Sequence, residues 1–531
     1  MNALMLITLS LFCFVLAYIF YGKYLAKKLG IDAKRETPAH SLRDDVDYVP
    51  AKAPVLLGHH FASIAGAAPI IGPITAAVFG WVPVFLWILF GNIFIGAVHD
   101  LTSLVVSIRH KGQSIGKVIE AQIGQKGKQL FLIFSWATLV LIISAFAILV
   151  AQTFVTTPAV ATSSVLFIAL AIFFGISIYR VKASLGVATL VGILLLLLCV
   201  WLGVKFPFVL SQDKIFSQQI WTWILFAYIF AASVTPVWIL LQPRDYLNSF
   251  LLYIVLFGAF VGIIFSNPAL KFPAFTNFTD PNLGAMFPIL FVTVACGAIS
   301  GFHSLVASGT TAKQLNKETD AKPIGYGAML IEGLLAIIAL ITVAKLAQSE
   351  YSVQLADLGV IGFFSKGVGN FVTKLGIPLN VGITFAALAE TQKQKILTNR
   401  FTATLLTILP AGILAFSGSY KAIWPIFGAA NQLLAALALL AGSVWLAKKQ
   451  QKNYFLRYPM YFMFAVTLSA LIVLIYKNIQ IIVSYYTGQE LAKNFSLTGT
   501  YLLSVIAILL FSIAIVLVIE AYKQLAKTSS K

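Results

Sequence analysis

The chain has 531 residues, of which 60% are hydrophobic and only 10% are charged, whereas a soluble domain carries about 25% charged residues. Its apolar residues come in blocks of 17–27 positions, and about 20 such residues cross a hydrocarbon core as a helix. The net charge of +19 fits the excess of Lys and Arg on the inside loops of membrane proteins. No basic run has the interleaved aromatics of a nucleic-acid site. The sequence therefore predicts an all-α polytopic membrane protein whose partners include a lipid bilayer and no nucleic acid.

Fifteen transmembrane spans are predicted along the chain. They are 3–22, 57–80, 82–108, 129–155, 160–178, 184–204, 219–243, 247–266, 286–311, 324–346, 376–392, 401–417, 421–447, 458–478 and 498–522. With the N-terminus outside, 28 of the 37 Lys and Arg residues fall on inside segments. A miscounted span would scramble this division, so the charges favour an outside N-terminus and an inside C-terminus.

Two segments between spans are long. Residues 25–53 form the longest inside segment, and their mixed charges and two prolines predict an ordered loop or a short interfacial helix. The outside stretch 347–375 is interpreted as a re-entrant or interfacial helix.

The span 57–80 holds two glycines and two prolines within eight residues. Proline removes a donor and clashes with the preceding turn, and glycine has a low helix preference. We therefore expect two half-helices joined by extended backbone near mid-membrane, the alternative being a kink that eases packing. A substrate site is predicted at the residues of this break, which are Gly66, Ala67, Ala68, Pro69 and Gly72.

A second candidate break lies in the span 219–243, where Ser233, Thr235 and Pro236 complete the predicted substrate site. Its alternative is a plain proline kink. The two interrupted spans are the second and the seventh and run in opposite directions. Corresponding breaks in two inverted halves point to a transporter binding site, where half-helix N-termini hold an anionic group without a buried Arg.

This pairing divides the chain into three parts. Residues 1–56 are a first helix with its cytoplasmic loop, 57–392 a ten-helix inverted-repeat core, and 393–531 accessory helices. The predicted core has five helices in each half, with its first and sixth helices broken.

Four ionisable residues are predicted to lie at one depth inside the spans: His60, Asp100, His303 and Glu332. Each is 8–10 residues from the nearest inside Lys or Arg, which is about 12–15 Å along a helix. Because ionisable groups inside a membrane are functional by default, we interpret them as a proton-coupling layer. The alternative is a static network of buried hydrogen bonds. His59 and His99 are expected to face elsewhere on their helices.

Two further groups of polar residues have less specific interpretations. The span 286–311 is rich in glycine and hydroxyl residues, and Ser304, Ser308 and Thr310 are a candidate ion site or part of a small-residue helix interface. Arg244 and Asp245 fall at an inner helix end and are interpreted equally as a gate ion pair or a structural cap.

The sequence has no nucleophile–base pair, phosphate loop or metal-ligand spacing, which argues against an enzyme and against a bound cofactor. The three cysteines lie inside apolar spans without paired spacing and are read as buried small residues. Nothing in the sequence fixes the oligomeric state.

Several long stretches resemble the carbon starvation protein A (CstA) family of bacterial inner-membrane transporters. They include GHHFASIAGAAPIIGP (58–73), PVWILLQPRDYL (236–247), ACGAISGFHSLVASGTTAKQL (295–315) and FGAANQLLAALAL (427–439). The sequence departs from the family at 385–400, which reads FAALAETQKQKILTNR in place of a Thr-Thr-x-Asp-x-x-x-Arg-like stretch.

The resemblance implies a LeuT-like core and the import of peptides or of a small carboxylate such as pyruvate during nutrient starvation, with protons as the coupling ion. In a LeuT-like core the first and eighth helices are neighbours. This makes His60 and His303 the expected closest pair of the layer, and Glu332 the most remote member. Sodium coupling and a nutrient sensor without flux are the alternatives.

Overall fold

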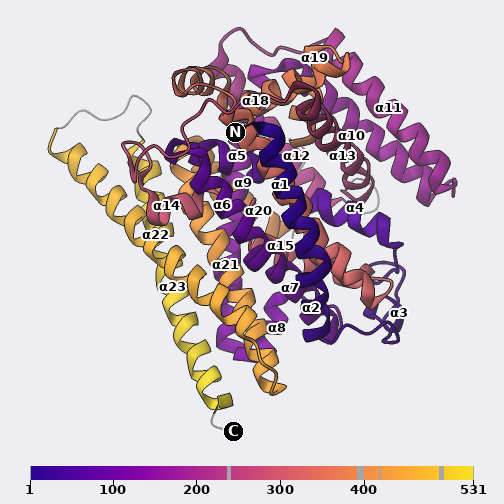
Figure 1. Cartoon of the computed structure of the whole chain (residues 1–531), viewed down its shortest axis with the longest axis vertical. Helices are drawn as coiled ribbons and strands as arrows, with labels where there is room; N and C mark the ends of the chain where they lie inside the picture. Colours follow the sequence, from indigo (N-terminus) through magenta and orange to yellow (C-terminus); the bar gives the residue numbers. More distant parts are fainter. Residues whose placement is uncertain (1, 236–240, 391–399, 418–419, 489–495, 530–531) are drawn as a thin grey trace.

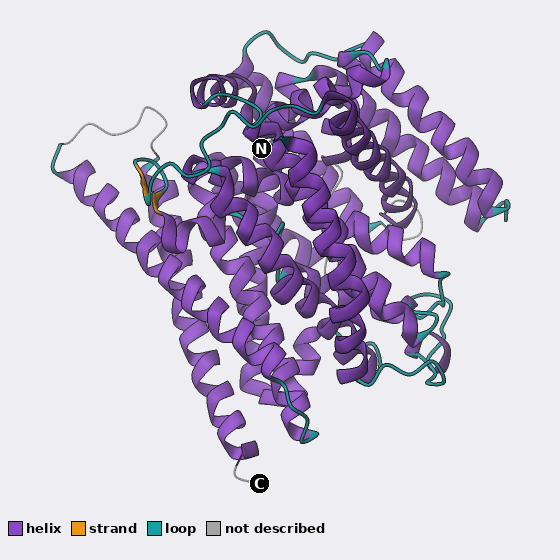
Figure 2. Ribbon diagram, viewed as in Figure 1, coloured by secondary structure: helices purple, strands orange, loops and turns teal. Residues whose placement is uncertain are grey.

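The computed structural model describes the whole chain except residues 1, 236–240, 391–399, 418–419, 489–495 and 530–531. The described residues fold into helices and one small hairpin, in which β1 (Thr279–Asp280) pairs antiparallel with β2 (Gly284–Ala285) (Figure 2). The N-terminus lies towards one end of the helical bundle and the C-terminus at the opposite end (Figure 1).

Twelve helical segments of the described chain are long and apolar enough to cross a membrane, and a bent pair of shorter helices makes up to thirteen. The long segments are α1 and α2 (Ala3–Leu16, Gly22–Lys28), α6 and α7 (Trp81–Gly91, Ala97–Arg109), α9 (Gln125–Thr156), α10 (Pro158–Tyr179), α11 (Leu185–Lys205), α12 (Lys214–Val234), α13 (Leu241–Ser266), α17 (Ala328–Ala344), α18 (Gln348–Val372), α21 (Tyr420–Lys448), α22 (Tyr454–Tyr486) and α23 (Leu497–Ser529). The shorter ones are α3 (Pro38–Ser41), α4 (Ala53–Ile64), α5 (Ala68–Ala76), α8 (Ile115–Ile123), α14 (Met286–Thr293), α15 (Phe302–Val306), α16 (Ala312–Gln314), α19 (Leu379–Glu390) and α20 (Arg400–Ser417). Wider π-helical turns at Ala17–Tyr21, Asn92–Gly96, Ala307–Thr311 and Lys322–Gly327 join neighbouring segments.

This count differs from the fifteen spans predicted. The predicted spans 376–392 and 401–417 become the short helices α19 and α20, and 286–311 is divided between α14 and α15. The stretch 347–375, predicted to lie outside, forms α18, which is long and apolar enough to count as a span. Hydropathy alone does not show where a helix within an apolar stretch stops.

Helix α18 bends at Gly359, whose φ of 65° is left-handed and suits a residue without a side chain. Before the bend, the Tyr351 hydroxyl donates to the Ile74 carbonyl at the end of α5 (2.8 Å). After the bend, Gly367 accepts from Lys345 Nζ just beyond α17 (3.4 Å). Both halves of α18 therefore rest on one end of the bundle.

The loop 25–53 is ordered, as predicted, and packs against the opposite end. Its backbone pairs with the end of α16, since Ala51 N donates to Gln314 O (3.0 Å). Arg109 at the end of α7 binds Glu318 through both terminal nitrogens, with 2.8 Å from Nη1 to Oε2. Arg35 of the loop reaches the same carboxylate (3.3 Å).

Helix α21 lies inside the bundle, although the sequence placed it among accessory helices. Its described side chains are buried almost without interruption from Ile423 to Leu446. At Gly428 an added Cβ would lie 2.1 Å from the Val292 carbonyl oxygen, so the backbones of α21 and α14 are in direct contact. Only a glycine permits that approach, and α21 is therefore part of the core.

Helix α5 crosses the end of α14 in the same way. A Cβ on Gly72 would lie 2.7 Å from Thr293 O and 2.9 Å from Val294 Cα. Both neighbours are backbone atoms, so a side chain cannot turn aside to make room.

We therefore expect Gly72→Ala to force α5 away from α14 and to lower the free energy of unfolding by about 1–3 kcal/mol, as overpacking does. Thermal unfolding of the purified protein in detergent measures this. The control is Gly186→Ala in α11, where no atom lies within 4 Å of the added Cβ. Equal stability of both variants would contradict the close crossing.

Candidate functional site

The first helix break falls where the sequence predicted it. Helix α4 ends at Ile64, α5 begins at Ala68, and the two are bent by 44°. Proline at the start of α5 suits a first turn, because its missing N–H has no partner there in any case. Residues 65–67 between the helices are buried, so their backbone is enclosed by protein rather than lipid.

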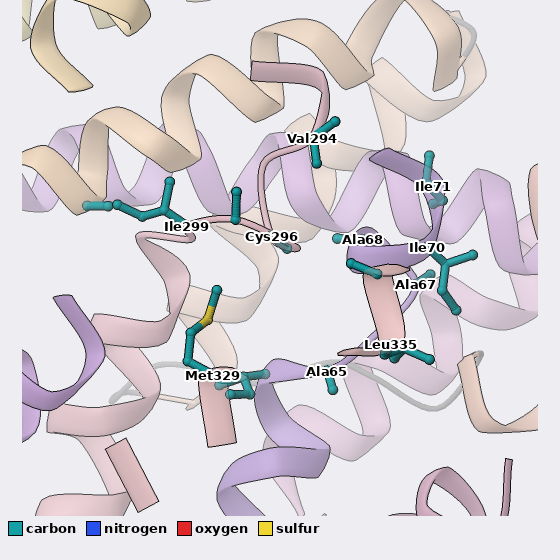
Figure 3. Close-up of a cluster of buried hydrophobic side chains, with 14 of the residues drawn as sticks. Ala65, Ala67, Ala68, Ile70, Ile71, Val294, Cys296, Ile299, Met329 and Leu335 are labelled. Atoms are coloured by element: carbon teal, nitrogen blue, oxygen red, sulfur yellow. The ribbon is translucent and has the colours of Figure 1, made fainter. Parts of the chain in front are cut away.

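A second break separates α14, which ends at Thr293, from α15, which begins at Phe302. Residues 294–301 between them are non-helical and buried. The two breaks lie against each other, with Ala65, Ala67 and Ala68 in one buried cluster with residues of 294–301 (Figure 3). A Cβ on Gly297 would lie 3.7 Å from Pro69 O.

The second break is therefore not the one predicted at Ser233–Pro236. Helix α12 does stop there, at Val234, but the helix that follows begins a new span, so the interruption separates two spans. Ser233 bonds Thr404 of α20, Thr235 caps α12, and Pro236 lies outside the described residues.

Side chains from two other helices bind the backbone around the second break. From α21, the side-chain oxygen Oδ1 of Asn431 accepts from Phe302 N (2.9 Å). The main-chain carbonyl of Asn431 accepts from Gly301 N (3.0 Å). From α6, Trp87 Nε1 donates to Val294 O (3.2 Å). Asn92, just beyond α6, donates to Gly297 O (3.3 Å).

Two further donors from α21 bind the last turn of α14. Trp424 Nε1 donates to Thr293 O (3.4 Å) and Gln432 Nε2 to Phe291 O (2.7 Å). These supporting residues were not singled out from the sequence. Asn431 and Gln432, which are adjacent in an otherwise apolar span, could have indicated them.

A cavity of about 70 Å³ lies between the two breaks, with room for several water molecules. Gly66 and Ala68, both predicted substrate residues, line it, while Ala67, Pro69 and Gly72 are buried within or just after the first break. Its polar lining comprises Ser63, Arg244, Asp245, Ser300 and His303. Leu139, Ile142, Ile143 and Phe146 of α9 form an apolar wall together with Phe427 of α21.

His303 contacts two of the other three predicted coupling residues, Asp100 and Glu332. Its Nδ1 lies 2.8 Å from Asp100 Oδ2 and its Nε2 lies 3.5 Å from Glu332 Oε2. Asp100 belongs to α7 and Glu332 to α17, so the network links three elements, and all three side chains are fully buried. Nδ1–H can donate to Asp100, and each of the three side chains can bind or release a proton, so the group can hold different numbers of protons.

Several finer expectations about this layer change. Glu332, expected to be the most remote, contacts His303 directly. His99 was expected to face elsewhere, but its Nδ1 lies 2.7 Å from Asp100 Oδ1, because an imidazole ring is long enough to turn towards the next residue. His60 Nδ1 lies 2.8 Å from Thr311 Oγ1. The pairing of His60 with His303 stays a prediction.

The candidate ion-site hydroxyls are used within their own helix. Ser304 donates to Gly301 O (2.6 Å), Ser308 to Ser304 O (2.6 Å) and Thr310 to Val306 O (3.1 Å). Such bonds to the preceding turn are common for hydroxyls in membrane helices. A hydroxyl that donates in this way keeps its oxygen lone pairs, so the candidate ion site stays a prediction.

The predicted ion pair forms between Arg244 Nη2 and Asp245 Oδ1 (3.1 Å). It is buried beside the cavity rather than exposed at a helix end, with 2% and 5% of the two residues exposed. His59 was expected to face elsewhere on its helix, as a packing or interfacial residue, and its Nδ1 lies 3.8 Å from Asp245 Oδ2. From the sequence, an anionic group was expected to be held without a buried arginine, and the fold places the buried Arg244 beside the cavity.

Two broken helices that enclose a cavity within a bundle of apolar helices define a multi-pass membrane protein with a candidate binding site between the breaks. The chain belongs to the family of carbon starvation protein CstA, whose family model matches residues 2–389 and 381–470.

Its relatives are named as transporters. A peptide transporter CstA of Bacillus subtilis is 32% identical over 100% of this chain and 98% of its own length, and one of Campylobacter jejuni is 33% identical over 93% and 82%. The pyruvate/proton symporter BtsT of Escherichia coli is 31% identical over 85% of this chain and 78% of its own. Among solved structures, a manganese transporter of Eremococcus coleocola matches with 16% identity and a TM-score of 0.47, covering 92% of this chain and 99% of that one.

Because Asn431 satisfies the broken backbone directly, we expect Asn431→Ala to lower the free energy of unfolding by about 1–3 kcal/mol. It should also change the rate at which N-ethylmaleimide modifies Cys296, which accepts from Asn431 Nδ2 (3.4 Å). Thermal unfolding and peptide mass spectrometry measure the two effects.

Asn453→Ala is the control, since Asn453 is equally buried and donates to Ser443 O (2.7 Å) away from the break. It should lose stability without altering Cys296. A stable Asn431→Ala protein with unchanged Cys296 reactivity would count against this role.

Proposed function

We propose that this protein is a secondary active transporter that imports small carboxylates such as pyruvate, or peptides, by proton symport. The observation that carries the proposal is the position of His303, which lines the cavity and contacts both Asp100 and Glu332. A substrate in the cavity and a proton on the network would thus meet at one side chain. The names of the relatives support both substrate classes.

The transporter is proposed to lie in the bacterial inner membrane, with its N-terminus outside and its C-terminus inside. The distribution of Lys and Arg supports this orientation. The loop 25–53 and the ends of α7 and α16 would then form the cytoplasmic side, with α18 on the outer side.

A LeuT-like core with five helices in each half is part of the proposal. The break between α4 and α5 falls at the first predicted interruption and supports this arrangement. Helices α4–α5 and α14–α15 contact each other as the first and eighth helices of such a core do. Rocking of the broken helices against their neighbours would open the cavity to each side in turn.

Sodium coupling is the alternative mechanism, and a nutrient sensor without flux is the alternative function. In proteoliposomes we expect an inward proton gradient, imposed without sodium, to drive accumulation of pyruvate or of a dipeptide at least tenfold above the gradient-free level. Replacing potassium by sodium outside should leave the rate unchanged. Accumulation that needs sodium would select the first alternative, and absence of flux under every gradient the second.

The coupling role of His303 is tested separately. His303→Gln removes the titrating ring but keeps a polar side chain, so we expect proton-driven accumulation to fall at least tenfold while counterflow exchange, which needs no net proton movement, is partly retained. His110→Gln is the matched control, because His110 is bound to Val106 O (2.7 Å) near the end of α7. Accumulation in His303→Gln with unchanged pH dependence would assign the histidine a structural role.

A further inference from the structure

Among the described residues that line the cavity, Arg244 alone carries a full and permanent positive charge. It lies in the first turns of α13 and only 2% of it is exposed. Nη1 donates to the Tyr228 hydroxyl and Nη2 to Asp245, each over 3.1 Å. Its Nε–H is buried and has no acceptor among the described residues. A buried donor without an acceptor is costly, so its place on a cavity wall indicates a ligand.

We propose that Arg244 anchors the carboxylate of the transported molecule, which accepts from Nε–H and from a terminal N–H of the guanidinium. This planar fork matches two carboxylate oxygens. The inference rests on the proposed transport function and narrows its substrates to molecules with a free carboxylate, which include pyruvate and peptides with a free C-terminus.

The partners of Arg244 allow such an exchange. Asp245 holds Arg244 through Oδ1, and its other oxygen lies 3.8 Å from His59 Nδ1. When a substrate carboxylate binds the guanidinium, Asp245 loses this contact and remains near His59. Asp245 and the substrate therefore compete for one cation.

The rest of the cavity suits a short apolar body. The aliphatic side chains of α9 and the ring of Phe427 face the same space as Arg244. A cavity with an apolar wall and a few fixed polar groups is the usual form of a small-molecule site. The charged end of a small acid would bind Arg244, and its carbon chain would lie on this wall.

The native Cys296 lines the same cavity and reports its occupancy. In a Cys13→Ser, Cys199→Ser background, purified protein is labelled with N-ethylmaleimide in the presence of pyruvate, of alanyl-alanine, or of the C-terminal amide of alanyl-alanine. We expect pyruvate, alanyl-alanine or both to slow labelling at least tenfold at saturation, and the amide to have no effect. Protection by pyruvate alone or by the dipeptide alone assigns the source of the carboxylate.

The decisive variant is Arg244→Gln/Asp245→Asn, which removes the anchor without leaving a buried carboxylate unpaired. It should raise the half-protecting concentration of the carboxylate at least tenfold. Arg109→Gln/Glu318→Gln is the matched control, since it neutralises another arginine–carboxylate pair at the end of the bundle and should keep protection.

Equal protection by the amide, protection that survives in Arg244→Gln/Asp245→Asn, or no protection by either carboxylate would each overturn the proposal. Labelling needs no gradient, so its outcome is separate from that of transport. Protection without uptake would refute the proposed function and leave the anchor in place. Proton-driven uptake with an unchanged KM in Arg244→Gln/Asp245→Asn would refute the Arg244 anchor and leave the proposed function in place.

Discussion

The structure depends on one constraint, which is that peptide groups without helical partners inside a membrane must be bound by protein. Residues 294–301 are such a segment, and the side chains of Trp87, Asn92 and Asn431 bind backbone groups within it or at its end. These donors and acceptors come from α6, from the turn that follows it, and from α21. The last of these lies more than a hundred residues further along the chain. Buried polar groups fix a unique arrangement only when they are satisfied, so the break and its supporting helices form one unit.

The same break creates the site. Where the helix is interrupted, side chains and backbone turn towards the first break, and a cavity remains between them. The first turn after the interruption carries His303, which places an ionisable ring at the cavity on one side and against Asp100 and Glu332 on the other. The cost of enclosing those groups is offset by their mutual contacts, and the arrangement brings three ionisable side chains together beside the cavity.

Both ends of the bundle are covered around this centre. At one end the bent helix α18 lies on α5 and on the end of α17 through Tyr351 and Lys345. At the other end the loop 25–53 is tied to α7 by Arg109 and Glu318. Opening of the cavity towards either end would therefore require movement at that end, and the two ends are made of different elements.

The sequence by itself determined what depends on local chemistry: the helical membrane class, the helix break around Gly66 and the order in the loop 25–53. Composition, proline positions and residue spacing fix these because each acts within one helix or one turn. Tertiary structure decided which break faces the first one, the entry of α21 into the core, the turn of His99 towards Asp100 and the burial of Arg244 beside the cavity. Each of these depends on which helices become neighbours, and the pattern within a single apolar span carries no information about its neighbour.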